Sequence, residues 1–266
     1  MSQPQPVYLV ATVNDPENRL AALTQQVLPD ILPLYHGVSL LCSPATSLEA
    51  VALLRALGAT AAYDEDEPDD LSHIGRKRRQ ALRLGLAASV QHLHLCDFDR
   101  ALHWMATTPD ELRRTVATIP GYDLLVLGRT PRALETHPPH QTRTEALANH
   151  VFGLAYGQDM DITGGSRALS RRAAEYLVAH SQEPGIGVDA EWPLLLQQAG
   201  GMKIDYRACE GLEFETSDRF GPEIEAAGGL PAWVAAMSAD PKRWSRRLRL
   251  ATEIAEAAAE LAGDKG

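Results

Sequence analysis

The sequence predicts an α/β protein with a mostly parallel sheet flanked by helices, followed by a helical C-terminal extension. Short, continuous apolar segments recur in the first half of the chain, at 7–13, 38–43, 59–63, 92–96 and 122–128. Segments with helical periodicity separate them, and strands that are apolar on both faces are typical of a buried parallel sheet. The chain has 266 residues, which is long enough for a large α/β domain with a substantial core.

The predicted helices begin and end at recognisable signals. An apolar helical face spans 20–34, where two prolines must kink or divide the helix. Thr46 and Glu49 form a capping-box pattern that opens the next helix. A third helix is expected over 75–88, and a fourth begins near Thr108, with proline in its first turn. In the less regular second half we expect a loop over 129–141 and helices over 144–156, from about 171, and after 220.

Composition excludes several classes of protein. The formal net charge is -10, which disfavours generic binding to nucleic acid or to anionic membranes. No apolar run reaches about 18 residues and the N-terminus lacks a signal-peptide pattern, so we expect a cytoplasmic protein with no transmembrane segment. The three cysteines are far apart in the sequence, which argues against a disulfide framework or a structural zinc site.

Charged side chains directly follow several predicted strands. Ligands of open α/β sheets bind beyond the carboxyl ends of the strands, so this shared position predicts a ligand site. The residues concerned are Asp15, Asp64, Glu65, Asp97, Asp99 and Arg129.

Asp97 and Asp99 form a D-x-D pair at the end of the strand HLHLC. Two carboxylates beside a diphosphate can share a divalent ion with it, because hard cations prefer oxygen ligands. The alternative is a polar strand end without a ligand. Arg100 would either hold a phosphate itself or weaken metal binding. His92 and His94, within the strand, are expected to be core residues.

A basic helix start and two loop histidines are further candidates for this site. Gly75 and Arg76 open a helix, where backbone N–H groups and a nearby cation suit a phosphate, although several of the neighbouring basic residues must simply be solvated. His137 or His140 could complete a metal shell begun by Asp99; the alternative is exposed loop histidines.

Two segments of the second half carry the remaining candidates. Gly164 and Gly165 form a tight turn that could let the backbone approach a ligand, or could be purely conformational. Asp189 and Glu191 lie at a helix start, where an aspartate could cap the helix or act as a catalytic base. A solvated basic helix face is expected for Arg246, Arg247 and Arg249.

The order of these features over about 7–215 resembles that in nucleotide-sugar-dependent glycosyltransferases of the GT-A fold. LVATVNDPENRLAAL resembles the first strand, turn and helix of family-2-like enzymes, and IGRKRRQALRLGLAASVQHLHLCDFDR resembles their basic helix and D-x-D strand. DITGGSRALSRRAAEYL resembles the acceptor-side segment, and GVDAEWPLLLQQAGGMKI resembles the acidic helix and following strand. The nearest resemblance is to the retaining enzymes that make glucosyl-3-phosphoglycerate or mannosylglycerate.

The resemblance implies a GT-A-like domain over 1–220 with a helical extension over 221–266 packed on it. It implies a nucleoside diphosphate sugar as donor, a small hydroxylated acceptor and a Mg²⁺ or Mn²⁺ ion, and it allows a homodimer.

The resemblance also implies roles for individual residues. Asp99 would bind the metal ion with Asp97 assisting, and His140, or else His137, would supply a further ligand. Asp189 would be the base, as in inverting relatives, with Glu191 as the second acidic candidate. Asp64 or Glu65 would hold the base or ribose, Arg76 would meet the diphosphate, and Gly164 and Gly165 would lie near the sugar and acceptor. Asp15 and Arg129 are assigned to the donor site because they follow strand ends.

Three other interpretations compete with this one. Sugar-nucleotide pyrophosphorylases share the fold type but open with a glycine-rich basic loop, and VNDPENRL contains no glycine. Haloacid-dehalogenase-like phosphatases also use D-x-D, but their motif normally continues to Thr or Val, whereas Ala101 follows Arg100 here. A glycosyltransferase-like scaffold that binds a ligand without turnover stays open, because Arg100 disturbs the aspartate pair.

Overall fold

The computed structural model of the protein describes residues 5–64 and 71–262. Within these residues, seven strands form one sheet in the order β3-β2-β1-β4-β6-β5-β7. Neighbouring strands are parallel except at β6, which runs antiparallel to both β4 and β5, so the predicted mostly parallel sheet is confirmed. The strands are β1 (Gln5–Val13), β2 (Tyr35–Cys42), β3 (Thr60–Tyr63), β4 (His92–Cys96), β5 (Leu124–Arg129), β6 (Ser166–Ser170) and β7 (Ile204–Cys209).

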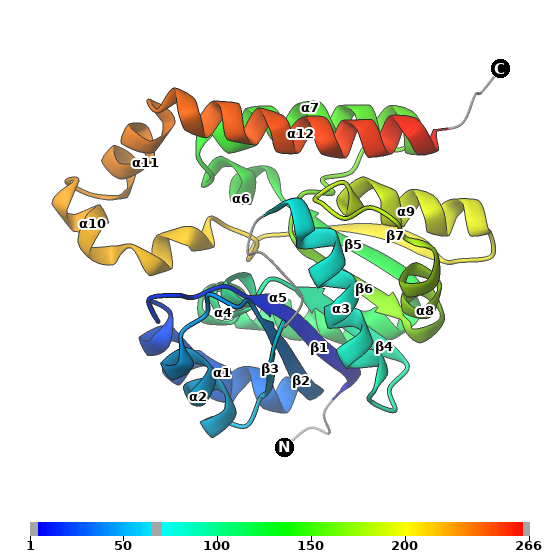
Figure 1. Ribbon diagram of the computed structural model, residues 1–266, viewed down its shortest axis with the longest axis horizontal. Coiled ribbons are helices and arrows are strands. Elements are labelled where there is room, and N and C mark those ends of the chain that lie inside the picture. The colour runs from blue at the N-terminus through cyan, green and yellow to red at the C-terminus, as the bar shows by residue number, and fades with distance from the viewer. Residues whose placement is uncertain (1–4, 65–70, 263–266) are drawn as a thin grey trace.

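Helices cover both faces of this sheet, as Figure 1 shows. The first nine are α1 (Ala21–Ile31), α2 (Leu48–Ala56), α3 (Ile74–Leu86), α4 (Phe98–Thr107), α5 (Pro109–Thr118), α6 (Pro131–Glu135), α7 (Pro139–Tyr156), α8 (Arg171–His180) and α9 (Val188–Ala199) in the part of the chain that the structure describes. The last three are α10 (Gly221–Ala226), α11 (Leu230–Ser238) and α12 (Pro241–Leu261). One buried cluster joins α1, α2, α4 and α5 to the sheet, and a second joins α3, α7, α8, α9 and α12 to its other face.

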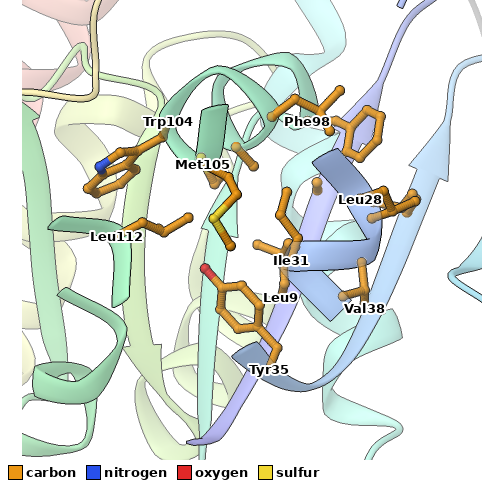
Figure 2. Close-up of a cluster of buried hydrophobic side chains, with 14 of the residues drawn as sticks. Leu9, Leu28, Ile31, Tyr35, Val38, Phe98, Trp104, Met105 and Leu112 are labelled. Carbon is orange, nitrogen blue, oxygen red and sulfur yellow. The ribbon is translucent and has the colours of Figure 1, made fainter. Parts of the chain in front are cut away.

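Strand β1 shows why the predicted strands are apolar throughout. Successive side chains of a strand point to opposite faces, and both faces of this sheet are covered. Leu9 therefore packs into the first cluster and Val10 into the second. Figure 2 shows Leu9 in the first cluster together with Ile31 of α1 and Trp104 of α4.

His94 of β4 is a satisfied core residue, as expected. Its Nδ1 atom lies 2.7 Å from the hydroxyl of Tyr35, and its Nε2 atom lies 2.9 Å from that of Ser166. Burial lowers the pKa of His94 to about 3. The ring is therefore neutral and bridges β4 to β2 and β6.

The start of α2 differs from the prediction, while the division after α1 is confirmed. Helix α1 ends at Ile31, and a short 3₁₀ turn, Leu32–Leu34, follows. The cap of α2 is Ser47, whose hydroxyl accepts the backbone N–H of Ala50 at 3.1 Å. Thr46 instead donates to the carbonyl of Val13 at 3.1 Å and so ties the loop to the end of β1.

The segment 129–141 was predicted as a loop, and this prediction is wrong. Helices α6 and α7 both begin in it, each with proline in its first turn. Proline is tolerated there because the first turn of a helix has no acceptor for its N–H groups. The hydroxyl of Thr130 also caps α6 by accepting the backbone N–H of Ala133 at 3.1 Å. His140 therefore lies on α7, not in a loop.

The predicted helical C-terminal extension is present, and α12 runs alongside α7 (Figure 1). Its residues Ala251, Ile254 and Ala258 belong to the same buried cluster as α7 and α9. The division of the chain at 220 stays a prediction. Among the described helices, none is long and apolar enough to cross a membrane.

Candidate active site

A cavity of about 590 Å³ lies past the carboxyl ends of β1 and β4, and we call it the strand-end cavity. Thr12 and Asn14 reach it from the end of β1, and Asp97 and Asp99 reach it from the segment after β4. Helices α7 and α12 and the 3₁₀ segment Glu215–Arg219 line its other sides. The strand ends at which the sequence predicted a ligand site therefore border a cavity.

Both aspartates of the D-x-D pair are already engaged by cationic or hydroxyl groups. The Oδ2 atom of Asp99 accepts a 2.8 Å bond from Nη2 of Arg219. The Oδ1 atom of Asp97 accepts a 3.3 Å bond from the hydroxyl of Thr12, and its Oδ2 atom lies 3.8 Å from Nη2 of Arg78. Burial raises the pKa of Asp97, and the charge of Arg78 opposes that rise.

Arg100 lies in the same cavity, and only part of its hydrogen-bonding capacity is used. The side chain belongs to a residue that is 6% exposed, and its Nη2 atom donates to Oε1 of Glu215 at 3.1 Å. Its Nε and Nη1 atoms are buried without a hydrogen-bond partner, as is Oε2 of Glu215. Burial raises the pKa of Glu215, and the charge of Arg100 lowers it. Buried N–H groups without acceptors are rare in proteins, which points to a ligand that supplies one.

Asp189 reaches the cavity as the partner of two buried arginines. Its Oδ1 atom accepts hydrogen bonds from Arg78 and from Arg167. Because Arg78 also lies beside Asp97, it connects the helix α9 to the D-x-D segment. Asp189 is thus placed as a counter-charge that holds Arg78 at the cavity wall.

Glu191 is not brought to the cavity. Its Oε1 atom accepts the backbone N–H groups of Gln182 at 2.8 Å and Glu183 at 3.1 Å, and its Oε2 atom accepts from the hydroxyl of Ser181. These bonds close the loop before α9, because a carboxylate satisfies backbone donors that helix and sheet do not use. The structure therefore gives Glu191 a role in the loop, separate from Asp189.

Several predicted donor residues support their own loops outside the lining of the cavity. The oxygens of Asp15 accept the backbone N–H groups of Arg19 at 2.8 Å and Leu20 at 3.0 Å. Asp64 accepts two bonds from Arg76, at 3.1 and 2.8 Å. Glu65 lies outside the residues that the structure describes.

Arg129 and Gly164 are also fixed elsewhere. The guanidinium of Arg129 pairs with Asp161 at 2.7 Å and with Glu145 at 2.8 Å, and it lines a separate cavity of about 400 Å³. A Cβ atom at Gly164 would lie 2.6 Å from the carbonyl of Leu127, so this glycine serves close packing. Only Gly165 of the pair lines the strand-end cavity.

The predicted metal group of Asp97, Asp99 and His140 is not brought together. The Nδ1 atom of His140 lies 3.1 Å from the hydroxyl of Ser238, and His140 is not part of the cavity lining. The alternative, His137, has Nδ1 3.0 Å from the carbonyl of Ala133, and burial lowers its pKa to about 2. No group of three or more His, Cys, Asp or Glu side chains in the described residues could hold a metal ion.

Sequence reasoning missed the residues that segments distant in the sequence bring to the cavity. Arg247, expected to be solvated, is half-buried and lines the cavity from α12, whereas Arg246 lines it but is exposed, as predicted. Arg247 donates to Oε1 of Gln141 at 3.0 Å and lies 3.4 Å from Oε1 of Glu145. The sequence did indicate that Arg247 faces the protein. Arg247, Leu250, Ala251 and Ile254 follow helical spacing and therefore share one face of the helix, which is otherwise apolar.

The charges that line the cavity are balanced. Five arginines and five acidic residues contribute to its wall, without any lysine or histidine among the described lining residues. The arginines are Arg78, Arg100, Arg219, Arg246 and Arg247, and the acidic residues are Asp97, Asp99, Glu145, Asp189 and Glu215. Guanidinium groups are suited to phosphate and carboxylate oxygens because they offer several N–H groups in a fixed plane.

No protein-family model matches this chain, and no curated protein matches it in sequence. Solved structures do match it. Glucosyl-3-phosphoglycerate synthase from Mycobacterium tuberculosis, in complex with Mn²⁺, UDP and phosphoglyceric acid, gives a TM-score of 0.50 and 14% identity over 86% of this chain and 78% of that chain. A mycobacterial protein gives a TM-score of 0.51 and 16% identity over 77% of this chain and 67% of that chain.

A further structure of the same synthase, in complex with Mg²⁺ and UDP, gives a TM-score of 0.48 and 15% identity over 76% of this chain and 68% of that chain. At identities this low the likeness shows the fold alone. The chain has the GT-A fold of glucosyl-3-phosphoglycerate synthase, which confirms the fold predicted from its sequence.

Proposed function

We propose that the chain is a glycosyltransferase that moves a hexose from a nucleoside diphosphate sugar to a small hydroxylated acceptor. The observation that carries this proposal is the buried guanidinium of Arg100. This residue lines a cavity at the carboxyl edge of a GT-A sheet, and its Nε and Nη1 atoms are buried without partners. A diphosphate supplies the oxygen acceptors that these atoms lack.

The chemistry of glycosyl transfer fits such a cavity. The bond between the sugar and the diphosphate breaks, and negative charge develops on the departing diphosphate. Cationic groups that are already oriented toward that position stabilise the charge without having to reorganise. Arg100 and Arg219 are placed for this role, since both line the cavity and both are held by carboxylates.

The acceptor is proposed to bind on the side of the cavity formed by α12. Arg246 and Arg247 lie there beside the apolar side chains of Leu250 and Ile254. Two arginines would favour an acceptor that carries a carboxylate or phosphate group next to its hydroxyl. One of the solved synthase structures is a complex with phosphoglyceric acid, a molecule of this chemical kind.

Asp189 is the only one of the two predicted catalytic residues that lines the cavity. We keep it as a candidate base, although its bonds to Arg78 and Arg167 also suit a purely electrostatic role. A homodimer and a cytoplasmic location remain proposals; exposed Leu147 and Leu154 on α7 are compatible with the former.

A binding scaffold without turnover is the second candidate. It is favoured by the engagement of Asp97, Asp99 and Asp189 with arginine or threonine side chains, since a catalytic carboxylate must be able to exchange a proton or hold an ion.

The test is a thermal-shift panel of the full chain with UDP, GDP, ADP and their hexose conjugates, each in Mn²⁺ and in EDTA. A ligand at about 100 times its Kd adds about 2.7 kcal/mol of stability. For a chain of this size that raises Tm by about 5 °C or more. Release of the nucleoside diphosphate with a panel of hydroxy acids and phosphorylated alcohols then measures turnover.

Each outcome of this panel separates the candidates. A shift with turnover supports the transferase, and a shift without turnover on any acceptor supports the scaffold. If no nucleotide or nucleotide sugar changes Tm in either buffer, the donor site does not exist and the proposal is wrong. Arg113→Gln is the control variant, because Arg113 is an exposed surface residue paired only with Asp110 among the ion pairs of the described chain.

A further inference from the structure

The D-x-D segment of this chain has cationic side chains beside both of its carboxylates. The structures of glucosyl-3-phosphoglycerate synthase named above hold Mn²⁺ or Mg²⁺. Here Arg219 occupies Oδ2 of Asp99, and Thr12 and Arg78 flank Asp97. The described residues contain no cluster of three metal-ligating side chains at this or any other place. The described side chains therefore form no ready-made three-ligand site, and Arg219 and Arg78 lie where an ion would approach the two aspartates.

A guanidinium lies among the carboxylates instead. Arg100 bonds to Glu215 at 3.1 Å, and Gly165 locates it relative to the aspartate pair. A Cβ atom built on Gly165 would be 2.8 Å from Oδ2 of Asp97 and 3.1 Å from Nε of Arg100, so both groups border the same small space. That space is where the unpartnered Nε atom of Arg100 is found.

We propose that Arg100 and Arg219 bind the diphosphate of the donor directly, so that nucleotide binding in this chain needs no divalent cation. This inference rests on the proposed function and specifies what neutralises the diphosphate. Arg100 contributes the N–H groups of Nε and Nη1, which have no other acceptor. An anionic oxygen satisfies them with charge-assisted hydrogen bonds, the strongest class available to neutralise a phosphate without a metal.

Arg219 is held in place from two sides. Its Nη1 atom donates to the backbone carbonyl of Asn14 at 2.6 Å, and its Nη2 atom donates to Asp99 at 2.8 Å. Asn14 follows β1 and Asp99 follows β4, so Arg219 spans the ends of the two adjacent strands. In this arrangement the carboxylate of Asp99 orients a cation that meets the ligand, a role that a metal ion would otherwise fill.

The charges of the cavity wall bear on the same question. Five arginines match five acidic residues there, so the wall itself has no surplus of negative charge that would repel a diphosphate. A divalent ion that took Oδ2 of Asp99 would have to displace Arg219, and one that took Oε1 of Glu215 would have to displace Arg100. Displacing Arg100 would leave a buried cation without its counter-charge, which is unfavourable.

The test is calorimetric titration of the full chain with UDP, GDP and ADP, each in EDTA and in Mn²⁺. For the nucleotide that binds, we expect affinities in the two buffers to agree within about threefold, a difference of less than about 1 kcal/mol. Arg100→Gln and Arg219→Gln should each weaken binding by about tenfold to 100-fold in EDTA, because each removes charge-assisted bonds to the phosphate. Arg113→Gln, on the exposed side of α5, should leave the affinity unchanged.

Two results would overturn the inference, and they differ in whether they also contradict the proposed transferase function. Binding in Mn²⁺ that EDTA abolishes refutes metal independence and leaves the proposed transferase intact. Absence of binding for all three nucleotides in both buffers refutes the donor site and the inference together. If Arg100→Gln does not fold, Arg219→Gln still decides the matter, since Arg219 is partly exposed and wild-type metal dependence is measured without any substitution.

Discussion

Replacing Asp189 by Asn should destabilise the protein by about 3 kcal/mol, at the lower end of the range for a broken buried ion pair. Asp189 is 2% exposed and accepts hydrogen bonds from the buried side chains of Arg78 and Arg167. The substitution removes the charge that neutralises both. The lower end is expected because Arg78 keeps Asp97 at 3.8 Å, and Arg167 remains over the ring of Trp192, 5.4 Å from its centroid.

Urea denaturation followed by tryptophan fluorescence measures this change as a shift of the transition midpoint at constant slope. Asp110→Asn is the matched control, because its side chain is 79% exposed and pairs with an Arg113 side chain that is 51% exposed. A surface pair of this kind contributes less than about 1 kcal/mol. If Asp189→Asn destabilises no more than Asp110→Asn, Asp189 is not the counter-charge that we describe. Unchanged stability with lost turnover would instead make Asp189 the base that the sequence predicted.

Two further predictions concern a glycine and a histidine near the strand-end cavity. Gly165→Ala and Gly157→Ala should each lose about 1–2 kcal/mol of stability, because both glycines have positive φ, +66° and +90°. Only Gly165→Ala should weaken nucleotide binding in a titration, because a Cβ atom at Gly157 meets nothing within 4 Å. Equal nucleotide affinities of the two variants would contradict the close approach of Gly165 to the site. His94→Gln should make the free energy of unfolding depend less steeply on pH in acid. The pKa of His94 is about 3 in the folded protein, against an ordinary value of 6.5. The unfolded chain therefore takes up the proton first as pH falls, and the stability of the wild type decreases from about pH 6.5 toward pH 3. This group contributes a slope of about 1.4 kcal/mol per pH unit, and urea titrations at several pH values that give the same slope for His94→Gln and wild type would refute it.

The sheet was predictable because its signals are local. Strand β1 is apolar on both faces, as Leu9 and Val10 illustrate, and a sheet covered on both faces favours that pattern. Helices α6 and α7 were missed for the opposite reason. Proline normally interrupts a helix, but Pro131 and Pro139 lie in first turns, where the missing N–H group has no consequence.

The edge that carries the cavity was predictable, but not all of the residues that line it. Polar residues after parallel strands gather at one edge, and Asp97 and Asp99 do line the cavity there. Asp15 shares this position along the chain, yet its carboxylate caps its own turn at Arg19 and Leu20. A sequence pattern places a carboxylate at a strand end, whereas the nearest unsatisfied N–H groups decide what the carboxylate binds.

The function of a D-x-D pair is therefore decided by residues far away in the sequence. Asp99 faces Arg219, which is 120 positions along the chain, and Arg100 faces Glu215, 115 positions along it. Without those partners, the same two aspartates beside a strand end are free to bind a cation. With them, Asp99 pairs with Arg219 and Glu215 pairs with Arg100 in the wall of the cavity. Under the proposal above, the D-x-D pair predicts where a diphosphate is neutralised, and the residues opposite it determine whether a metal ion or an arginine does so.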